Sequence, residues 1–251
     1  MLFFPNCKIN IGLRVVARRA DGYHDLETVM FPVRGLYDEV EVVRTAGAGV
    51  DFRAEGLAVD CEPEQNICIR AFRLMHDRYG VDGVAIRLAK RVLCDIVEIV
   101  HAPGDGAEFV SSGLAVDCPP EKNLCLRAYR ALHERFPIGG VRIHLHKIVP
   151  MGAGLGGGSA DAAFVVKGLS ELFGLNLSRK CMEKLCAGIG SDTAFFVANC
   201  PALATGRGEI LEPVDFSLRG KRLLIVKPAE SVSTAEAYAG IAPRRTDRPL
   251  L

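Results

Sequence analysis

The sequence predicts a mixed fold of helices and strands, of the α+β class. Segments of alternating hydrophobicity, typical of strands, are followed repeatedly by segments with the apolar spacing of helices. A glycine-rich stretch in the middle of the chain lies between one such strand and one such helix. The 251 residues are 49% hydrophobic and 24% charged, which is ordinary globular composition and suffices for one large domain or two modest ones.

Charge and hydropathy exclude several classes of protein. The 31 Lys and Arg against 30 Asp and Glu leave no basic excess for a nucleic-acid backbone. The apolar runs fall short of the roughly 20 residues of a membrane span, and the N-terminus does not resemble a signal peptide. The nine cysteines lie scattered in apolar segments, as buried thiols do in a reducing compartment. We therefore expect a cytoplasmic enzyme without a nucleic-acid or membrane partner.

An internal repeat organises the first half of the chain. At an offset of 57 residues, 36–92 align with 93–149 without a gap, and 29 of the 57 pairs are identical. Matched polar residues such as Asn66 with Asn123 would not arise from apolar spacing alone. We interpret the segments as a tandem duplication and call them copy one (36–92) and copy two (93–149). Two copies are too few for a solenoid or a propeller, so we expect an insertion within one domain.

Each copy predicts the same order of elements: a strand, a glycine-containing turn, a short strand, a helix and a final strand. In copy one these are Leu36–Val43, a strand around Phe52, a helix through Cys68–Met75, and Gly83–Leu88. In copy two they are Leu93–Val100, a strand around Phe109, a helix through Cys125–Leu132, and Gly140–Leu145. Only copy two continues directly into the glycine-rich loop.

The glycine-rich loop, Pro150–Ala163, is the most informative stretch. Five of the seven residues 152–158 are glycine, so the backbone can approach a ligand closely and turn its N–H groups toward it. The N-terminus of the following helix adds a partial positive charge. Because apolar segments flank the loop, a flexible linker explains it poorly. The loop predicts a site for an anion such as a phosphate.

Two common phosphate-binding loops fit the sequence poorly. The loop contains G-x-G-x-x-G, but a dinucleotide fold needs a second parallel strand after the helix. Here the helix ends near Gly174, and a second helical segment, Met182–Cys186, follows. A P-loop needs Lys where this chain has another glycine. Phosphate binding must therefore rest on backbone groups, with Ser159 as an extra donor or a ligand of a magnesium–nucleotide.

The loop resembles the ATP-binding motif of the GHMP kinases. Residues 6–13, 19–28, 190–192, 204–209 and 232–234 are similar to the branch of that family that acts on a cytidine-diphosphate sugar alcohol. The resemblance implies a GHMP-kinase-like two-domain fold, with an N-terminal domain like the second domain of a small-subunit ribosomal protein and a C-terminal α+β domain. It also implies ATP-dependent phosphorylation of a hydroxyl of 4-diphosphocytidyl-2-C-methyl-D-erythritol, in non-mevalonate isoprenoid synthesis.

Asp192 and Lys8 are the candidate catalytic residues. Phosphoryl transfer to an alcohol needs a group that accepts the hydroxyl proton, and Asp192 follows a turn that would place it beside the loop. Lys8 lies in a half-buried strand, where an ammonium needs an anionic partner. The resemblance implies that these two residues pair. Without it, Asp192 is explained as a helix cap and Lys8 as an edge residue of a sheet.

The resemblance also implies the binding residues. Tyr23 is expected to stack on the cytosine ring and His24 to hydrogen-bond its edge, unless they only form a surface turn. Asn10 and Thr234 are expected to place the substrate by hydrogen bonds. The expected ATP-binding residues are Asn123 and Lys147 of copy two and, in the loop, Pro150, Gly152, Gly154, Leu155, Gly156, Gly157, Gly158, Ser159 and Ala160.

ATP with Mg²⁺ is the implied cofactor, and no metal site built from protein residues is expected. His144 and His146 share a strand face, but no third ligand lies nearby in the sequence.

The sequence departs from the family in three places. The family has one 57-residue unit, and we expect copy two to take its place because its last strand must enter the loop in register. The family's third motif has no match after Gly208, so we expect a first domain over 1–197 that contains both copies, and only the start of a second over 198–251. That second part would contain a strand at Arg222–Val226 and a disordered tail at Ala242–Pro249. Finally, Ala194 stands where the family usually has Pro.

Three functional hypotheses stay open at this point. The chain is an active kinase of this branch, an inactive or partly folded nucleotide-binding relic of it, or a different GHMP kinase such as a homoserine kinase. The sequence does not distinguish a monomer from a homodimer.

Overall fold

The computed structural model describes residues 1–33, 36–56, 62, 64, 66–92, 94–221, 223–225, 241 and 243. Its helices and strands confirm the α+β class. The chain forms two compact units: the first holds the described parts of 1–34, 94–217 and 230–251, and the second those of 35–93 and 218–229. None of the helices in the described part of the chain is long and apolar enough to cross a bilayer.

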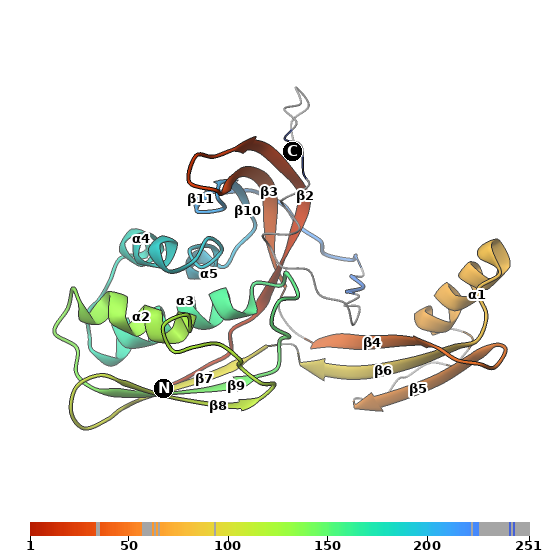
Figure 1. Ribbon diagram of the computed structural model, residues 1–251, viewed down its shortest axis with the longest axis horizontal. Coiled ribbons are helices and arrows are strands. Elements are labelled where there is room, and N and C mark those ends of the chain that lie inside the picture. Colours follow the sequence, from red (N-terminus) through yellow and green to blue (C-terminus); the bar gives the residue numbers. More distant parts are fainter. Residues whose placement is uncertain are drawn as a thin grey trace. The chain divides into compact units, whose positions relative to one another are not determined.

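The first unit places its helices between two four-stranded sheets (Figure 1). One sheet has the order β1-β7-β9-β8 and consists of β1 (Leu2–Phe3), β7 (Ile96–His101), β9 (Val141–Lys147) and β8 (Ala107–Gly113). The other has the order β11-β10-β3-β2 and consists of β11 (Ile210–Pro213), β10 (Ala202–Gly206), β3 (His24–Val33) and β2 (Cys7–Arg18). The helices are α2 (Leu124–His133), α3 (Gly157–Leu172), α4 (Arg179–Ile189) and α5 (Phe195–Ala198).

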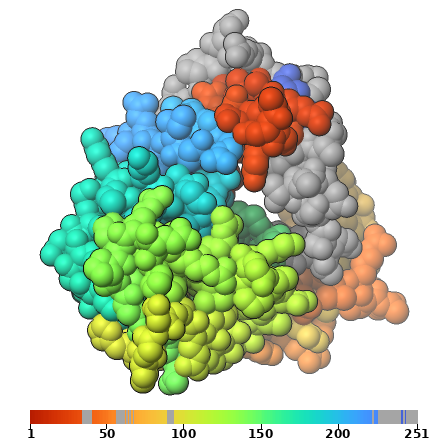
Figure 2. All heavy atoms as spheres, turned by 60° about the vertical axis from the view of Figure 1, so that its left-hand side comes forward, coloured from red at the N-terminus to blue at the C-terminus, as the bar shows by residue number. Residues whose placement is uncertain are grey.

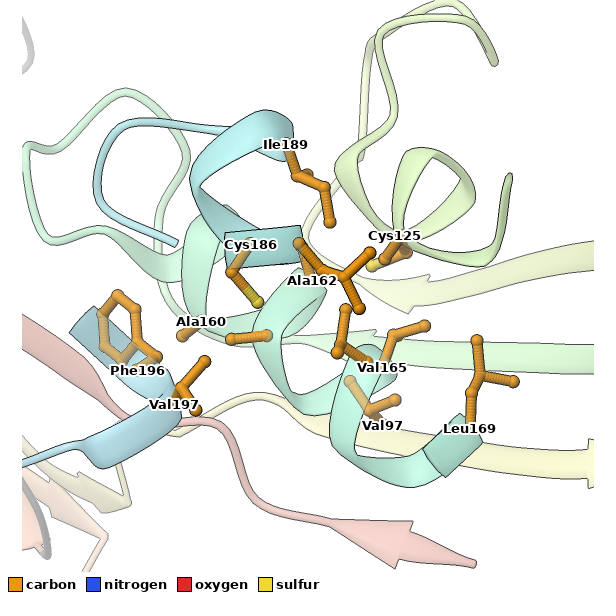
Figure 3. Close-up of a cluster of buried hydrophobic side chains, with 14 of the residues drawn as sticks. Val97, Cys125, Ala160, Ala162, Val165, Leu169, Cys186, Ile189, Phe196 and Val197 are labelled. Atoms are coloured by element: carbon orange, nitrogen blue, oxygen red, sulfur yellow. The ribbon is translucent and has the colours of Figure 1, made fainter. Parts of the chain in front are cut away.

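Apolar side chains from both sheets and the four helices of this unit meet in one core, part of which is drawn in Figure 3. Val97 of β7, Cys125 of α2, Val165 of α3, Cys186 of α4 and Phe196 of α5 are all buried there. Burial of apolar surface contributes roughly 25 cal/mol per Å², so this cluster is the main stabilising feature of the unit. It fixes α3, and with α3 the end of the glycine-rich loop.

The second unit consists of copy one and repeats the topology of copy two. Its elements are β4 (Leu36–Arg44), β5 (Val50–Gly56), α1 (Ile67–Tyr79) and β6 (Val84–Val92), in a sheet of order β4-β6-β5. In both copies the first strand is antiparallel to the last and the second strand is parallel to it. The register also matches at the offset of 57 residues, since Val43 pairs with Ala85 and Val100 with Arg142. The duplicated sequence therefore folds twice into the same unit.

Copy two shares its unit with the N-terminal strands and the loop, as the continuity of its last strand predicts. The chain leaves this unit after Val33, which pairs with Cys7, and returns at Cys94, which pairs with Asn6. Because the exit and the return lie at neighbouring positions of one strand, copy one is inserted without separating the segments that flank it.

The expected boundary between residues 197 and 198 does not separate the compact units. Strand β10 pairs antiparallel with β3, with Thr205 opposite Glu27, so this segment completes a sheet of the first unit. Figure 2 shows the N-terminal hairpin, in red, against the segment that follows residue 200, in blue.

Only a few described residues bear on the expectations for the C-terminal region. Leu223–Ile225, the described part of the expected strand Arg222–Val226, form no strand. The expected tail Ala242–Pro249 lies, apart from Pro243, outside the described residues.

A chain that lacks residues 36–92 is expected to fold as the first unit does now. The deletion joins Gly35 to Leu93, so it removes copy one without changing the residues that pair with the N-terminal strand. Its thermal unfolding, followed by circular dichroism, should be cooperative, with a midpoint within about 5 °C of the main transition of the full chain. An unfolded deletion variant would contradict the assignment of copy two to the first unit.

The reciprocal deletion of 93–149 is the matched control. It joins Val92 to Pro150 and places Val42 and Met75 where Ile99 and Leu132 now lie fully buried in the core. Because the volume and shape of these side chains differ, the free energy of unfolding of this variant should be about 1–3 kcal/mol lower than that of the chain that lacks 36–92.

Candidate active site

The glycine-rich loop runs from the end of β9 to the start of α3. Gly152, Gly154 and Gly156 have φ angles of 68°, 71° and 70°, a left-handed conformation that glycine adopts without strain. Among the described residues, no side chain caps the N-terminus of α3. The first-turn N–H groups and the helix dipole are therefore available to an anion, as the sequence predicts.

The predicted loop residues differ in how far they are exposed to solvent. The side chains of Leu155 and Ala160 are buried, so they support the loop, and a ligand could reach only their backbone. Gly157 is also buried. The remaining predicted members are exposed or half-buried: Pro150, Gly152, Gly154, Gly156, Gly158 and Ser159.

Strand β2 packs directly against this loop. The backbone N–H of Lys8 donates to the carbonyl oxygen of Leu155 at 2.8 Å. A Cβ atom at Gly156 would lie 3.1 Å from Cε of Lys8 and 3.1 Å from Cζ of Phe196. Glycine at position 156 thus allows the Lys8 side chain to run along the loop.

The Lys8 ammonium pairs with the Asp192 carboxylate. Their Nζ and Oδ2 atoms are 2.8 Å apart, and the Lys8 side chain is 3% exposed, whereas that of Asp192 is 29% exposed. A buried ammonium needs a close anion, so each residue restricts the position of the other. The structure therefore brings together the two predicted catalytic residues from distant parts of the sequence.

A tight turn after α4 presents Asp192 to the loop. The backbone N–H of Thr193 donates to the carbonyl oxygen of Gly190 at 3.1 Å, which closes the turn. A Cβ atom at Gly190 would lie 3.8 Å from Oγ of Ser159, and one at Gly208 would lie 3.5 Å from Oδ1 of Asp192. Four segments meet around the Lys8–Asp192 pair: β2, the glycine-rich loop, the turn after α4, and the turn between β10 and β11.

The structure does not place Lys147 where a nucleotide-contacting side chain was expected. Lys147 is buried beneath the loop in an ion cluster with Asp95 and Asp161, and none of the three is more than 2% exposed. Its ammonium donates to both carboxylates, with a distance of 2.9 Å to Oδ2 of Asp161. The alternation of buried and outward residues along β9 directs the Lys147 side chain to the core face.

Burial raises the pKa of the Asp161 carboxyl from 3.8 to about 8; the nearby Asp95 carboxylate adds to this rise and Lys147 opposes it. Burial alone would lower the pKa of Lys147, but the two carboxylates outweigh burial and raise it. Neither Asp95 nor Asp161 was among the site residues expected from the sequence. The repeat held a signal for the first, because Asp38 and Lys90 stand at the matching positions of copy one.

Asn123 acts as a helix cap in the structure. Its side-chain oxygen accepts the N–H groups of Cys125 and Leu126 at 2.9 and 3.2 Å, and the residue is buried. A contact with ATP remains a prediction for this residue.

The predicted cytidine-binding residues lie at the hairpin of β2 and β3. Tyr23 is 53% exposed, and the guanidinium carbon of Arg207 lies 5.3 Å from the centre of its ring. His24 is the first residue of β3, and Asn10 is exposed on β2, two positions beyond Lys8. Thr234 lies outside the described residues. The sequence analysis did not single out Arg207 individually.

His144 and His146 both contact the hydroxyl of Ser112, at 2.9 and 3.0 Å. In the part of the chain that the structure describes, no three His, Cys, Asp or Glu side chains are grouped to hold a metal ion.

Comparison with known proteins agrees with this geometry. The model of the GHMP kinase N-terminal domain matches residues 123–200, which run from the helix of copy two through the loop to the turn at Asp192. The chain is 35% identical over 250 residues to a 4-diphosphocytidyl-2-C-methyl-D-erythritol kinase of Parabacteroides distasonis, covering all of this chain and 70% of that protein. It is 38% identical over 247 residues to the kinase of that name from Bacteroides thetaiotaomicron, covering 98% of this chain and 70% of that protein.

A solved structure gives the same result. The crystal structure of a 4-(cytidine 5'-diphospho)-2C-methyl-D-erythritol kinase superposes with a TM-score of 0.52 and 27% identity, over 85% of this chain and 55% of that one. The chain thus spans about 70% of these curated relatives and little more than half of the solved kinase. The chain belongs to the 4-diphosphocytidyl-2-C-methyl-D-erythritol kinase family, within the GHMP kinases.

Proposed function

We propose that the chain transfers the γ-phosphoryl group of ATP to a hydroxyl of 4-diphosphocytidyl-2-C-methyl-D-erythritol. The observation that carries this proposal is the Lys8–Asp192 ion pair, with its ammonium packed along the glycine-rich loop. A phosphate-binding loop and a proton acceptor lie side by side here, as phosphoryl transfer to an alcohol requires.

Asp192 is proposed as the general base. Its carboxylate is half-exposed, so an acceptor hydroxyl can reach it, and the ion pair with Lys8 holds it in one orientation. The hydroxyl proton passes to Asp192 as the hydroxyl oxygen attacks phosphorus and the bond to the leaving ADP breaks. Lys8 fixes the orientation of the carboxylate for this role and adds positive charge beside the transferred phosphoryl group.

The loop is proposed to hold the nucleotide phosphates through its backbone. The left-handed glycines and the uncapped start of α3 supply N–H groups, and Ser159 supplies a hydroxyl. Mg²⁺ neutralises phosphate charge when bound, and it needs only one or two protein ligands if the phosphates supply the others. Ser159 fits that limited requirement, since its hydroxyl lies beside the turn at Gly190.

The hairpin of β2 and β3 is proposed to hold the cytidine. The exposed ring of Tyr23 offers a face for stacking, His24 offers an edge for hydrogen bonding, and the Arg207 guanidinium beside the ring adds a cation for the diphosphate. Asn10 and Thr234 remain proposed contacts to the sugar alcohol. A cytoplasmic location is part of the same proposal, and it is supported by the buried thiols of Cys7, Cys125 and Cys186.

Replacing Asp192 with Asn should abolish most turnover. The amide keeps the size of the side chain but cannot accept the proton, so kcat should fall by about 100-fold or more, with ATP affinity within about threefold. ADP release is measured with ATP, Mg²⁺ and the cytidylyl substrate, with homoserine as a comparison acceptor. Glu108→Gln breaks an exposed ion pair with Arg142 and serves as the control, which should keep full activity. Unchanged kcat in Asp192→Asn, or better turnover of homoserine, would contradict the proposal.

A pair of glycine variants tests the contact between the loop and Lys8. Gly156→Ala and Gly152→Ala impose the same left-handed strain of about 1–2 kcal/mol, because their φ angles are 70° and 68°. Only the first adds a methyl group against Lys8 and Phe196, whereas nothing lies within 4 Å of the second. Gly156→Ala should therefore lower the midpoint of unfolding more than Gly152→Ala does, and kcat should fall about tenfold further in Gly156→Ala. Equal kcat values would show that the approach of Lys8 to the loop is not needed for activity.

A further inference from the structure

The buried cluster of Lys147, Asp95 and Asp161 lies at both ends of the glycine-rich loop. The cluster has no exposed surface of consequence, so it cannot contact substrate directly. Any influence on the reaction must pass through the backbone segments that it holds.

The Asp95 carboxylate holds the entrance of the loop. Its Oδ1 atom accepts the backbone N–H groups of Ile148 and Val149 at 2.6 and 2.8 Å. These residues are the last before Pro150, where the loop begins. Charge-assisted hydrogen bonds of this kind are about twice as strong as neutral ones, so the backbone direction at the entrance is fixed.

The same cluster holds the exit of the loop. Asp161 lies at the beginning of α3, and its carboxylate accepts from the Lys147 ammonium at 2.9 Å. A Cβ atom at Gly157 would lie 3.0 Å from that ammonium, which therefore sits directly under the first turn of the helix.

Asp95 is also joined to the strand that carries Lys8. Its backbone N–H donates to the carbonyl oxygen of Pro5 at 2.9 Å, and the adjacent Cys94 pairs with Asn6. Lys8 follows two residues later on this strand. One buried residue thus contacts the entrance of the loop, the exit through Lys147, and the segment leading to the catalytic lysine.

We propose that Asp95 is a positioning residue for nucleotide binding. Its carboxylate holds the glycine-rich loop in the position in which the loop N–H groups can bind the phosphates and Lys8 can pair with Asp192. The inference rests on the proposed function, because it takes the loop to bind ATP. Asp95 touches no reacting atom and acts through the backbone of residues 148–157.

The variants Asp95→Asn and Asp161→Asn separate this role from a general effect of the cluster. In Asp95→Asn, the amide oxygen can still accept from the loop N–H groups, but the NH₂ group then faces the Lys147 ammonium, which is also a donor. The side chain can therefore no longer accept from both the loop and Lys147. In Asp161→Asn, the amide oxygen can still accept from Lys147, and Asp95 keeps all its contacts. Asp105→Asn, at an exposed carboxylate of copy two that pairs with His133, is the matched surface control.

Affinity for ATP is measured by titration with a fluorescent ATP analogue without acceptor, and KM for each substrate is measured by turnover. We expect Asp95→Asn to weaken nucleotide binding by about tenfold and to raise KM for ATP equally, with KM for the cytidylyl substrate within about twofold. Asp161→Asn should change nucleotide binding by about threefold or less, and Asp105→Asn should not change it.

Each other outcome is decisive. Equal nucleotide affinity in Asp95→Asn and Asp161→Asn, or an equal rise of both KM values, would overturn the inference. So would an unfolded Asp95→Asn beside a folded Asp161→Asn, because Asp95 would then support the whole fold and not the loop. If the unaltered chain binds ATP but phosphorylates nothing, the proposed function fails while the effect of Asp95 on binding still decides the inference.

The charge of the cluster supplies an independent pH readout. Among the described residues, three groups face Asp161: Lys147 of β9, Asp95 of the segment before β7, and the thiol of Cys125 of α2. Burial raises the pKa of the Cys125 thiol, so this thiol stays neutral. With the Asp161 pKa raised from 3.8 to about 8, the folded chain keeps a proton that the unfolded chain releases between these values. The contribution of Asp161 to stability is therefore present at low pH and is lost as pH rises toward 8.

Asp161→Asn cannot ionise, so its melting temperature should rise relative to the unaltered chain as pH increases from 5 to 8. A constant difference across this range would show that burial does not raise the pKa of Asp161.

Discussion

A buried ammonium on the first long strand and a carboxylate from a distant turn hold the candidate active site together. Lys8 has almost no contact with solvent, so its charge is tolerated only because Asp192 lies 2.8 Å away. That requirement fixes β2 against the turn after α4, with the glycine-rich loop between them. The ion pair thus joins segments that are far apart in the sequence at the place where the loop, the strand and the turn meet.

The duplication leaves this arrangement intact for a topological reason. The chain leaves the first unit beside Cys7 and returns beside Asn6. Copy one is therefore an insertion whose two ends lie next to each other. Copy two then provides the strand, the helix and two members of the ion cluster, Asp95 and Lys147, on which the loop rests. Copy one repeats the strands, the helix and the cap at Asn66, but no glycine-rich loop follows it in the sequence.

Much of the site follows from local sequence patterns, while the buried support does not. Glycine spacing between a strand and a helix predicts the loop, and a charged residue in an apolar strand predicts that Lys8 needs an anion. The identity of that anion came from family resemblance, because no local pattern joins residues so far apart. Lys147 was expected to contact ATP because copy two adjoins the loop, whereas the period-two alternation of β9 directs its side chain inward. Asp95 and Asp161 were missed because their partners come together only when two strands and a helix pack.

The most direct test is the ¹H–¹⁵N spectrum of the chain during addition of ATP with Mg²⁺. If the loop holds the phosphates through its N–H groups, the amide signals of residues 152–159 should shift most, together with that of Lys8, whose N–H is bonded to the loop at Leu155. The amides of α1 in copy one should not move. Shifts confined to another surface, with the signals of 152–159 unchanged, would contradict the assignment of this loop as the nucleotide site.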